Sequence, residues 1–311
     1  MWYVLSAIFL GWILGANNTA SIFGPGIVAG TFHHRKIVLI GSIFVVLGAL
    51  LNGQEGLKNV SSLSSEHPYD GMLVLICSAL TMLVLTKFGF PASATQTVFG
   101  GMVGVGLVRM GVASMRWSTI AKFLIFWLIT PLFAVMVAFF VFHIFAFFFR
   151  RIRKTQFQDA FIYISSWLTA LYDAYALGAN NVANVTGPVL NQLVSIHFAT
   201  LLGGFAIALG VVTSSKKVID TVGKQIVLLD HFSALIAMLA QAITLWTFSL
   251  IGVPIAASQA IVGGIIGVGL ARGVKLSSKK TVLEMVGAWF LSPIFSGVLV
   301  ALACRFVYLD L

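Results

Sequence analysis

Two polar motifs occur twice in this chain at one fixed spacing. Leu14-Gly15-Ala16-Asn17-Asn18 returns as Leu177-Gly178-Ala179-Asn180-Asn181, an offset of 163 residues (181 − 18). Gly89-Phe90-Pro91-Ala92-Ser93-Ala94-Thr95-Gln96 returns at the same offset (254 − 91) as Gly252-Val253-Pro254-Ile255-Ala256-Ala257-Ser258-Gln259. Polar, Gly- and Pro-containing elements that are duplicated in register within apolar sequence are typical of transporters built from two repeats.

Composition places these motifs inside a membrane protein. Hydrophobic residues make up 59% of the 311 residues and charged residues only 9%, against about 25% charged in a soluble domain. The apolar runs are long, which favours membrane helices over the short alternating strands of a β-barrel. The net charge of +10 comes from basic residues that gather at the edges of these runs. We therefore expect a lipid bilayer around the chain and no nucleic-acid partner.

The apolar stretches divide the chain into two halves. Each half holds five stretches. Because five is an odd number of membrane crossings, the second half enters the membrane from the opposite side, and the repeats are inverted. The prediction is an all-α polytopic membrane protein with two inverted-topology repeats of about five or six segments each, and with broken helices or re-entrant hairpins at mid-membrane. We expect a first repeat at 1–149, a basic cytoplasmic linker at 150–159 and a second repeat at 160–311.

Basic residues predict the orientation. The cluster Arg150-Arg151-Ile152-Arg153-Lys154 belongs in the cytoplasm, which puts both termini outside in a multi-pass protein of the plasma membrane. Arg109, Arg116 and Lys122 then fall on the outer side, against the positive-inside rule.

The duplicated motifs predict an anion site. A helix break at Gly-Ala-Asn-Asn would free backbone N–H groups at the start of a half-helix, where an anion binds readily. Pro91 and Pro254 favour two further helix starts, with hydroxyl and amide side chains in the first turn. The alternative is that these residues only bond across helices and pack them closely. The predicted substrate-binding residues are Asn17, Asn18, Asn180, Asn181, Ser93, Thr95, Gln96, Ser258 and Gln259.

Asp173 is an ionisable residue inside an apolar stretch, and its repeat mate (173 − 163) is Leu10. An intramembrane carboxylate indicates a partner for a cation or a proton, or else a pair with a helical neighbour. The sequence shows no Cys/His cluster with metal-ligand spacing, no phosphate-binding GxxxxGK loop and no pattern of a nucleophile with its base. We therefore expect no enzyme activity and no bound cofactor.

At these motifs the chain resembles the inorganic phosphate transporter (PiT) family, whose signatures Gly-Ala-Asn-Asp-Val-Ala-Asn and Pro-(Val/Ile)-Ser-(Ser/Thr)-Thr-(Gln/His) are both duplicated. Asn17, Asn180 and Asn184 match the first signature, while Ser21 replaces its last Asn in the first half. Asn18 and Asn181 stand where the signature has Asp. The resemblance implies cation coupling at the signature positions Asn18, Asn181, Ser21 and Asn184, with a Na⁺ site at Asn18 and Asn181. Asp173 lies outside the signature and is a further candidate for cation coupling because it is an intramembrane carboxylate.

The resemblance implies a secondary active transporter that imports inorganic phosphate by symport with Na⁺ or H⁺, by alternating access around a central site. Loss of both signature carboxylates weakens cation binding and eases entry of an oxyanion without protons. The alternatives are therefore a permease for sulfate or another oxyanion, and a sensor that binds without transporting. An intramembrane enzyme is the least favoured alternative. A homodimer is one expectation for the oligomeric state.

Overall fold

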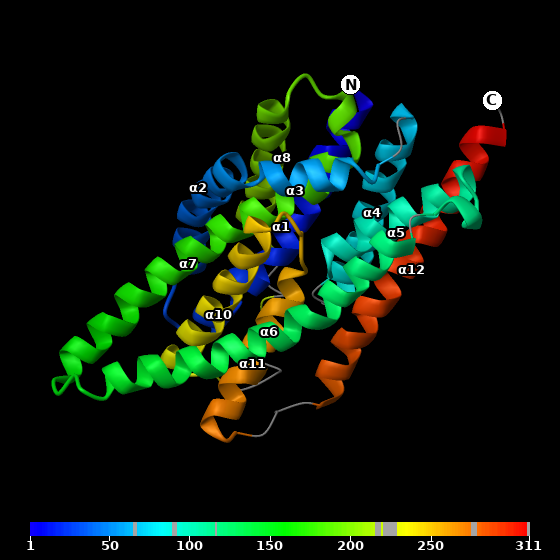
Figure 1. Ribbon diagram of the computed structural model, residues 1–311. Helices are drawn as coiled ribbons and strands as arrows, with labels where there is room; N and C mark the ends of the chain where they lie inside the picture. The colour runs from blue at the N-terminus through cyan, green and yellow to red at the C-terminus, as the bar shows by residue number, and fades with distance from the viewer. Residues whose placement is uncertain are drawn as a thin grey trace.

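The computed structural model describes residues 1–64, 67–88, 92–115, 117–214, 219, 229–274 and 279–309. Every regular element in this part of the chain is helical (Figure 1). Gly89, Phe90 and Pro91, which belong to the second predicted motif, lie outside the described residues, as does Arg116.

The long helices of the two halves follow one another in the same order. The first half contains α1 (Trp2–Val28), α2 (His34–Asn52), α3 (Gln54–Ser61), α4 (Pro68–Phe88), α5 (Ala94–Arg109), the short η1 (Val112–Ser114) and α6 (Trp117–Phe149). The second half contains α7 (Thr155–Thr186), η2 (Gly187–Gln192), α8 (Ile196–Val212), α10 (His231–Leu250), α11 (Ala257–Arg272) and α12 (Lys279–Leu309). Both ends of α5 and α11 differ by 163 residues (257 − 94 and 272 − 109), so the motif offset extends to the helices.

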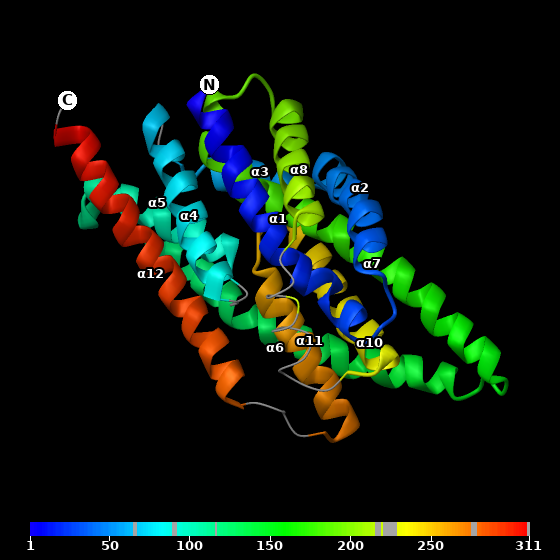
Figure 2. The ribbon, with the colours of Figure 1, turned by 180° about the vertical axis from the view of Figure 1, so that it is seen from behind.

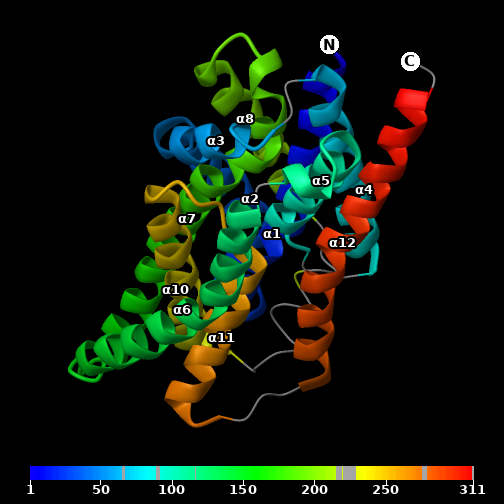
Figure 3. The ribbon, with the colours of Figure 1, turned by 45° about the vertical axis from the view of Figure 1, so that its right-hand side comes forward.

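The two halves run in opposite senses and interlock. α1 descends from the end of the molecule where α12 finishes, whereas α7 rises from the linker at the opposite end (Figures 1 and 2). α1 packs against α8, and its counterpart α7 packs against α2. In the same exchange α5 packs against α12, and α11 against α6, as Figure 3 shows for α12. Each half therefore completes the packing of the other.

Two pairs of helices form antiparallel hairpins. The first hairpin consists of α4 and α5. The Arg109 Nε at the end of α5 lies 3.2 Å from the Asp70 carboxylate at the start of α4, so the first turn of α4 and the last turn of α5 lie together at the open end of this hairpin. Arg272 at the end of α11 lies 3.5 Å from Asp230 at the start of α10, which closes the second hairpin in the same way. Arg109, whose predicted outer position conflicts with the positive-inside rule, thus pairs with the Asp70 carboxylate, which is 1% exposed.

The outer surface is built for lipid. Among the described residues, six helices are long and apolar enough to cross a membrane, namely α1, α2, α4, α6, α10 and α12. The most apolar window is 72% buried in α1 and α10, but 11% in α6 and 22% in α12. Large apolar side chains on α6 and α12, such as Leu132 and Phe306, are therefore exposed where lipid tails would contact them.

The predicted linker at 150–159 includes the start of a helix. α7 begins at Thr155, so residues 155–159 form the first turn of a 32-residue helix and the beginning of the second. A helix can extend beyond the apolar stretch because its backbone bonds are internal and its polar first turns lie in water.

Candidate functional site

The predicted helix breaks at the Asn pairs are wrong. α1 passes through Asn17 and Asn18, and α7 passes through Asn180 and Asn181, without interruption. The glycine before each pair serves close packing instead. A Cβ at Gly15 would overlap the carbonyl oxygen of Ile207 in α8, and one at Gly178 would overlap that of Val45 in α2. Small residues that let backbones approach are the usual means of packing membrane helices.

The helix starts predicted at the other motif are present. α5 begins at Ala94 and α11 at Ala257, each directly after an extended residue. The Ser93 hydroxyl caps α5 by accepting a hydrogen bond from the backbone N–H of Gln96 at 3.2 Å. Ala256 caps α11 and has no side-chain acceptor. The Gln259 N–H donates instead to the Ala256 carbonyl oxygen at 3.1 Å, and the first turn of α11 keeps the partial positive charge of a helix start.

The tips of the two hairpins meet at the second Asn motif. The hydroxyl of Thr95 in α5 donates to the carbonyl oxygen of Ile255, just before α11, at 3.1 Å. The Asn180 amide donates to the same carbonyl at 2.8 Å and accepts from the Ile255 N–H at 3.0 Å. Asn184 donates to the Thr95 hydroxyl at 3.0 Å and to the Asn181 side-chain oxygen at 3.3 Å. The structure thus brings three of the four motifs together around buried hydrogen bonds.

The first Asn motif joins the site through other partners. Asn17 donates to the hydroxyl of Thr86, in the last turn of α4, at 2.8 Å. Asn18 is buried beside it, and Asn181 in the other half donates back to Leu177 of its own helix. Since α1 also packs against α11, the residues of all four motifs lie on elements that contact one another.

Four of the uncharged side chains predicted for the site keep unpaired polar atoms. Within the described part of the chain, the hydroxyl oxygens of Ser21 and Ser258 have no hydrogen-bond partner. The same is true of the side-chain oxygens of Gln96 and Gln259, which are repeat mates (259 − 96 = 163). All four residues are at most 4% exposed. Unpaired buried polar atoms cost about 1–3 kcal/mol each, so they indicate a site that a polar ligand completes.

The chemistry of this site is that of a neutral oxyanion receptor. Hydroxyl and amide groups can donate to oxyanion oxygens and can also accept from a protonated one. The first turns of α5 and α11 add N–H groups and partial positive charge. None of the nine predicted substrate-binding residues carries a charge, so selectivity rests on hydrogen-bond geometry and on the dipoles of the helices.

Some polar residues near these elements were missed from the sequence. Thr86 was not singled out, although it bonds Asn17, and neither was Lys87, an exposed lysine at the tip of α4. Gln241 of α10 is fully buried, and in the described residues both of its side-chain polar atoms lack a partner. A lysine or a glutamine inside an apolar stretch is the signal that could have identified the last two.

Asp173 is fully buried in α7, two helical turns before Asn180. Neither of its carboxylate oxygens has a hydrogen-bond partner among the described residues. The alternative prediction, that Asp173 pairs with a neighbour on its own helix, is therefore wrong for the described residues of α7. The other buried acidic side chain among the described residues, Asp70, pairs with Arg109.

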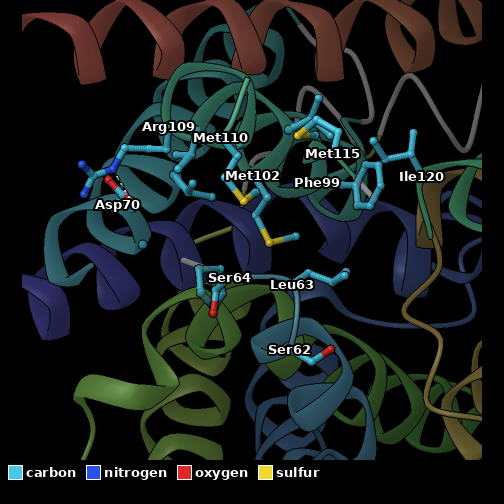
Figure 4. A pocket seen from close by; sticks show the side chains of 16 residues that line it. Ser62, Leu63, Ser64, Asp70, Phe99, Met102, Arg109, Met110, Met115 and Ile120 are labelled. Atoms are coloured by element: carbon cyan, nitrogen blue, oxygen red, sulfur yellow. Dashed lines mark hydrogen bonds and ion pairs between the residues drawn. The ribbon is translucent and has the colours of Figure 1, made fainter. Parts of the chain in front are cut away.

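A separate cavity of about 360 Å³ lies at the open end of the first hairpin. Figure 4 shows the Asp70–Arg109 pair on one side of it and methionine side chains along its wall, with Ser62 and Ser64 opposite. It contains none of the predicted site residues, so it is distinct from the meeting point of the hairpin tips. Its lining is formed mainly by α5, by the start of α4 and by the segment after α3.

Burial raises the pKa of the Asp230 carboxyl, at the open end of the second hairpin, but its hydrogen bonds with Ser233 and the charge of Arg272 lower it by more. The pKa of this carboxyl therefore lies below its ordinary value, and the group stays ionised to hold Arg272.

Both the sequence and the fold are similar to those of anion permeases. The sequence pattern described as "Phosphate transporter family" matches residues 14–167 and, a second time, residues 153–300. A protein of Pyrococcus abyssi named as a phosphate permease is 25% identical over 99% of this chain and 98% of its own length. The sulfate permease CysP of Bacillus subtilis is 27% identical over 94% of this chain and 84% of that protein.

A solved structure described as "The sodium-dependent phosphate transporter" shares the fold. Its TM-score is 0.90 at 22% identity, and the match covers 100% of this chain and 99% of that one. The architecture of interlocked repeats with two hairpins is thus shared along the full length of the chain.

Proposed function

Because this chain belongs to the phosphate transporter family, we propose that it is a secondary active transporter that imports inorganic phosphate by alternating access around the meeting point of the two hairpin tips. The observation that carries this proposal is the pair of repeat-related glutamines, Gln96 and Gln259, whose side-chain oxygens are buried and unpaired among the described residues.

Phosphate near neutral pH still carries at least one proton and therefore needs an acceptor as well as donors. The glutamine oxygens can accept from its P–OH group, while the hydroxyls of Ser21 and Ser258 donate to its other oxygens. The first-turn N–H groups of α5 and α11 approach from the two halves, where the helix dipoles favour an anion. Asn180 and Asn184 hold the tips in place through Ile255 and Thr95.

The coupling ion follows from the charge of the site. Moving a free anion into an apolar interior is costly, so a cation must travel with it. We propose Na⁺ or H⁺ in this role. For Na⁺, the candidate ligands are the side-chain oxygens around Asn18, Asn181, Ser21 and Asn184; the likeness to the sodium-dependent phosphate transporter supports this ion. For H⁺, the candidate carrier is Asp173.

Sulfate is the second candidate substrate. Asn18 and Asn181 lack the negative charge that would repel an ion without protons, and a relative of this chain is named a sulfate permease. Donors alone suffice for sulfate, whereas phosphate also uses acceptors.

The test is uptake into proteoliposomes containing the purified chain. Labelled phosphate is expected to enter by counterflow against internal phosphate, and excess sulfate is expected to compete weakly. Replacing Gln96 and Gln259 together by Met keeps the side-chain size and removes the acceptors. Loss of hydrogen bonds to a charged ligand, at about 1.5–3 kcal/mol each, should raise the half-saturating phosphate concentration roughly tenfold or more.

Three other outcomes would change the proposal. Saturable sulfate uptake that excess phosphate does not disturb would make sulfate the substrate. Anion binding without uptake under any gradient would indicate a sensor. A Gln96→Met/Gln259→Met variant that carries phosphate as well as the original chain would remove the glutamines from the site.

A further inference from the structure

One face of α7 carries a line of buried polar residues that leads to the candidate site. Ser166, Thr169, Asp173, Asn180 and Asn184 are each at most 6% exposed. Their spacing of three, four or seven residues places them within about a 60° sector of the helix, at roughly 100° per residue. Asp173 lies about 10 Å along the axis from both Ser166 and Asn180, at 1.5 Å per residue. We name this set the α7 polar stripe.

Asp173 is the unusual member of the α7 polar stripe. In the part of the chain that the structure describes, neither its carboxylate oxygens nor the Ser166 hydroxyl has a hydrogen-bond partner. The other described acidic residues are either exposed, like Asp159, or paired with a basic residue. A lone carboxylate in an apolar interior must be neutralised, by a proton or by a bound cation.

The surroundings of Asp173 favour a proton. A sodium ion needs several oxygen ligands at once, whereas a proton needs one, and Asp173 supplies two carboxylate oxygens that no described group approaches to hydrogen-bond distance. Tyr172 and Tyr175 flank Asp173 on its own helix. On the described helices packed against α7, the titratable groups lie in the first turn of a helix, on the short α3 or, for Arg109, in the last turn of α5: Tyr3, His34, Arg35, Lys36, Glu55, Lys58, Arg109, His197 and His231.

The first half has the same stripe without the charge. At the offset of 163, the residues on α1 are Tyr3, Ser6, Leu10, Asn17 and Ser21. Polar side chains recur at every position except Leu10, which is fully buried where α7 has Asp173. Two-fold related paths would carry two protons, and this chain retains a proton carrier on only one of them.

We propose that the α7 polar stripe is a proton path and that Asp173 carries one proton for each anion, so that coupling runs through the second repeat alone. The proton reaches Asp173 from the site beside Asn180 and leaves past Thr169 and Ser166 toward the linker end of the molecule. This inference rests on the proposed function, because it needs an anion that is carried.

The experiment uses proteoliposomes of the full chain with the membrane potential clamped to zero. Counterflow of labelled phosphate, without any gradient, first tests whether the anion is carried. Accumulation is then driven by a pH gradient in the absence of Na⁺. With one proton per anion, a tenfold proton gradient is expected to sustain about a tenfold gradient of the carried anion species, against a hundredfold for two protons.

Asp173→Asn keeps the side-chain shape and removes the carrier. We expect this variant to retain counterflow within about twofold and to lose pH-driven accumulation completely. Glu284→Gln, which removes a carboxylate that is 44% exposed at the start of α12, is the matched control and should leave both measurements unchanged. Ser166→Ala tests the path by a smaller change and should slow pH-driven uptake severalfold without altering counterflow.

The experiment distinguishes failure of the transport function from failure of the proton path. If the original chain shows no counterflow of any oxyanion, the transport function itself is wrong. If counterflow is present but Asp173→Asn still accumulates phosphate under a pH gradient, or if only a Na⁺ gradient drives accumulation, the proton path is wrong and the function stands. If Asp173→Asn does not fold, normal pH-driven uptake by Ser166→Ala would equally overturn the path.

Discussion

The Asn motifs and the hairpin tips contain similar polar residues but differ in backbone structure. In α1 and α7 the helix continues through Asn17-Asn18 and Asn180-Asn181, so only side chains are offered to the interior. In α5 and α11 the helix begins at the motif, so backbone N–H groups are offered as well. The difference shows that a glycine in a membrane helix marks either a break or a close contact, and that only its neighbours decide which.

The largest effect is expected at the packing glycines. Gly178→Ala would force a methyl group into the carbonyl oxygen of Val45, and because the obstacle is backbone the helices must separate. Overpacking costs about 1–3 kcal/mol, and a rigid backbone contact puts this case at the upper end or beyond it. Thermal unfolding in detergent should show a drop of several degrees or loss of folded protein. Gly287→Ala is the control, since nothing lies within 4 Å of its added Cβ. Equal stability of the two variants would contradict the packing role.

The next effect is expected at Asn180, which ties the unbroken helix to the hairpin tip. Asn180→Ala removes the side-chain acceptor of the buried Ile255 N–H, at about 1–3 kcal/mol, while the Ile255 carbonyl keeps its hydrogen bond from Thr95. We expect a lower unfolding temperature and at least a tenfold rise in the half-saturating anion concentration. Asn181→Ala loses two hydrogen bonds that both lie within α7, to Leu177 and from Asn184, so a larger effect there would reverse the assignment.

A third test restores the charge that the Asn motifs lack. Asn18→Asp and Asn181→Asp each add a carboxylate in a buried position of an unbroken helix. If these positions flank a cation site, the Na⁺ concentration for half-maximal uptake should fall about tenfold, which corresponds to about 1.4 kcal/mol. Uptake measured against Na⁺ concentration decides this, and an unchanged curve in both variants would exclude a cation site there.

The smallest effects are expected at the caps of the half-helices. Ser93→Ala removes the acceptor for the Gln96 N–H and should destabilise the chain by about 1 kcal/mol. Ala256→Ser supplies the side-chain cap that α11 lacks and should stabilise the chain by a similar amount. The thermal unfolding midpoint is therefore expected to fall in Ser93→Ala and to rise in Ala256→Ser. A loss of stability in Ala256→Ser would show that the N–H groups of this turn already have acceptors.

Much of the architecture followed from the sequence because hydrophobic length and the repeated offset are local properties. The apolar stretches correspond to the long helices, and Pro254 and the hydroxyl residues marked where α11 and α5 begin. The Asn pairs were misjudged because no local pattern records that Val45 and Ile207 lie against the glycines before them. The partners of the site residues, such as Thr86 for Asn17 and Ile255 for Asn180, also come from other helices.

The amino-acid sequence alone predicted an all-helical membrane protein made of two related halves, because hydrophobic length and duplication can be read directly along the chain. The tertiary structure decided that α6 and α12 cross over to pack on the opposite half, and that two hairpin tips meet beside Asn180. It also left Asp173 buried without a partner in the described chain. Contacts between residues far apart in sequence depend on how closely whole helices approach, and that distance is fixed by packing in three dimensions.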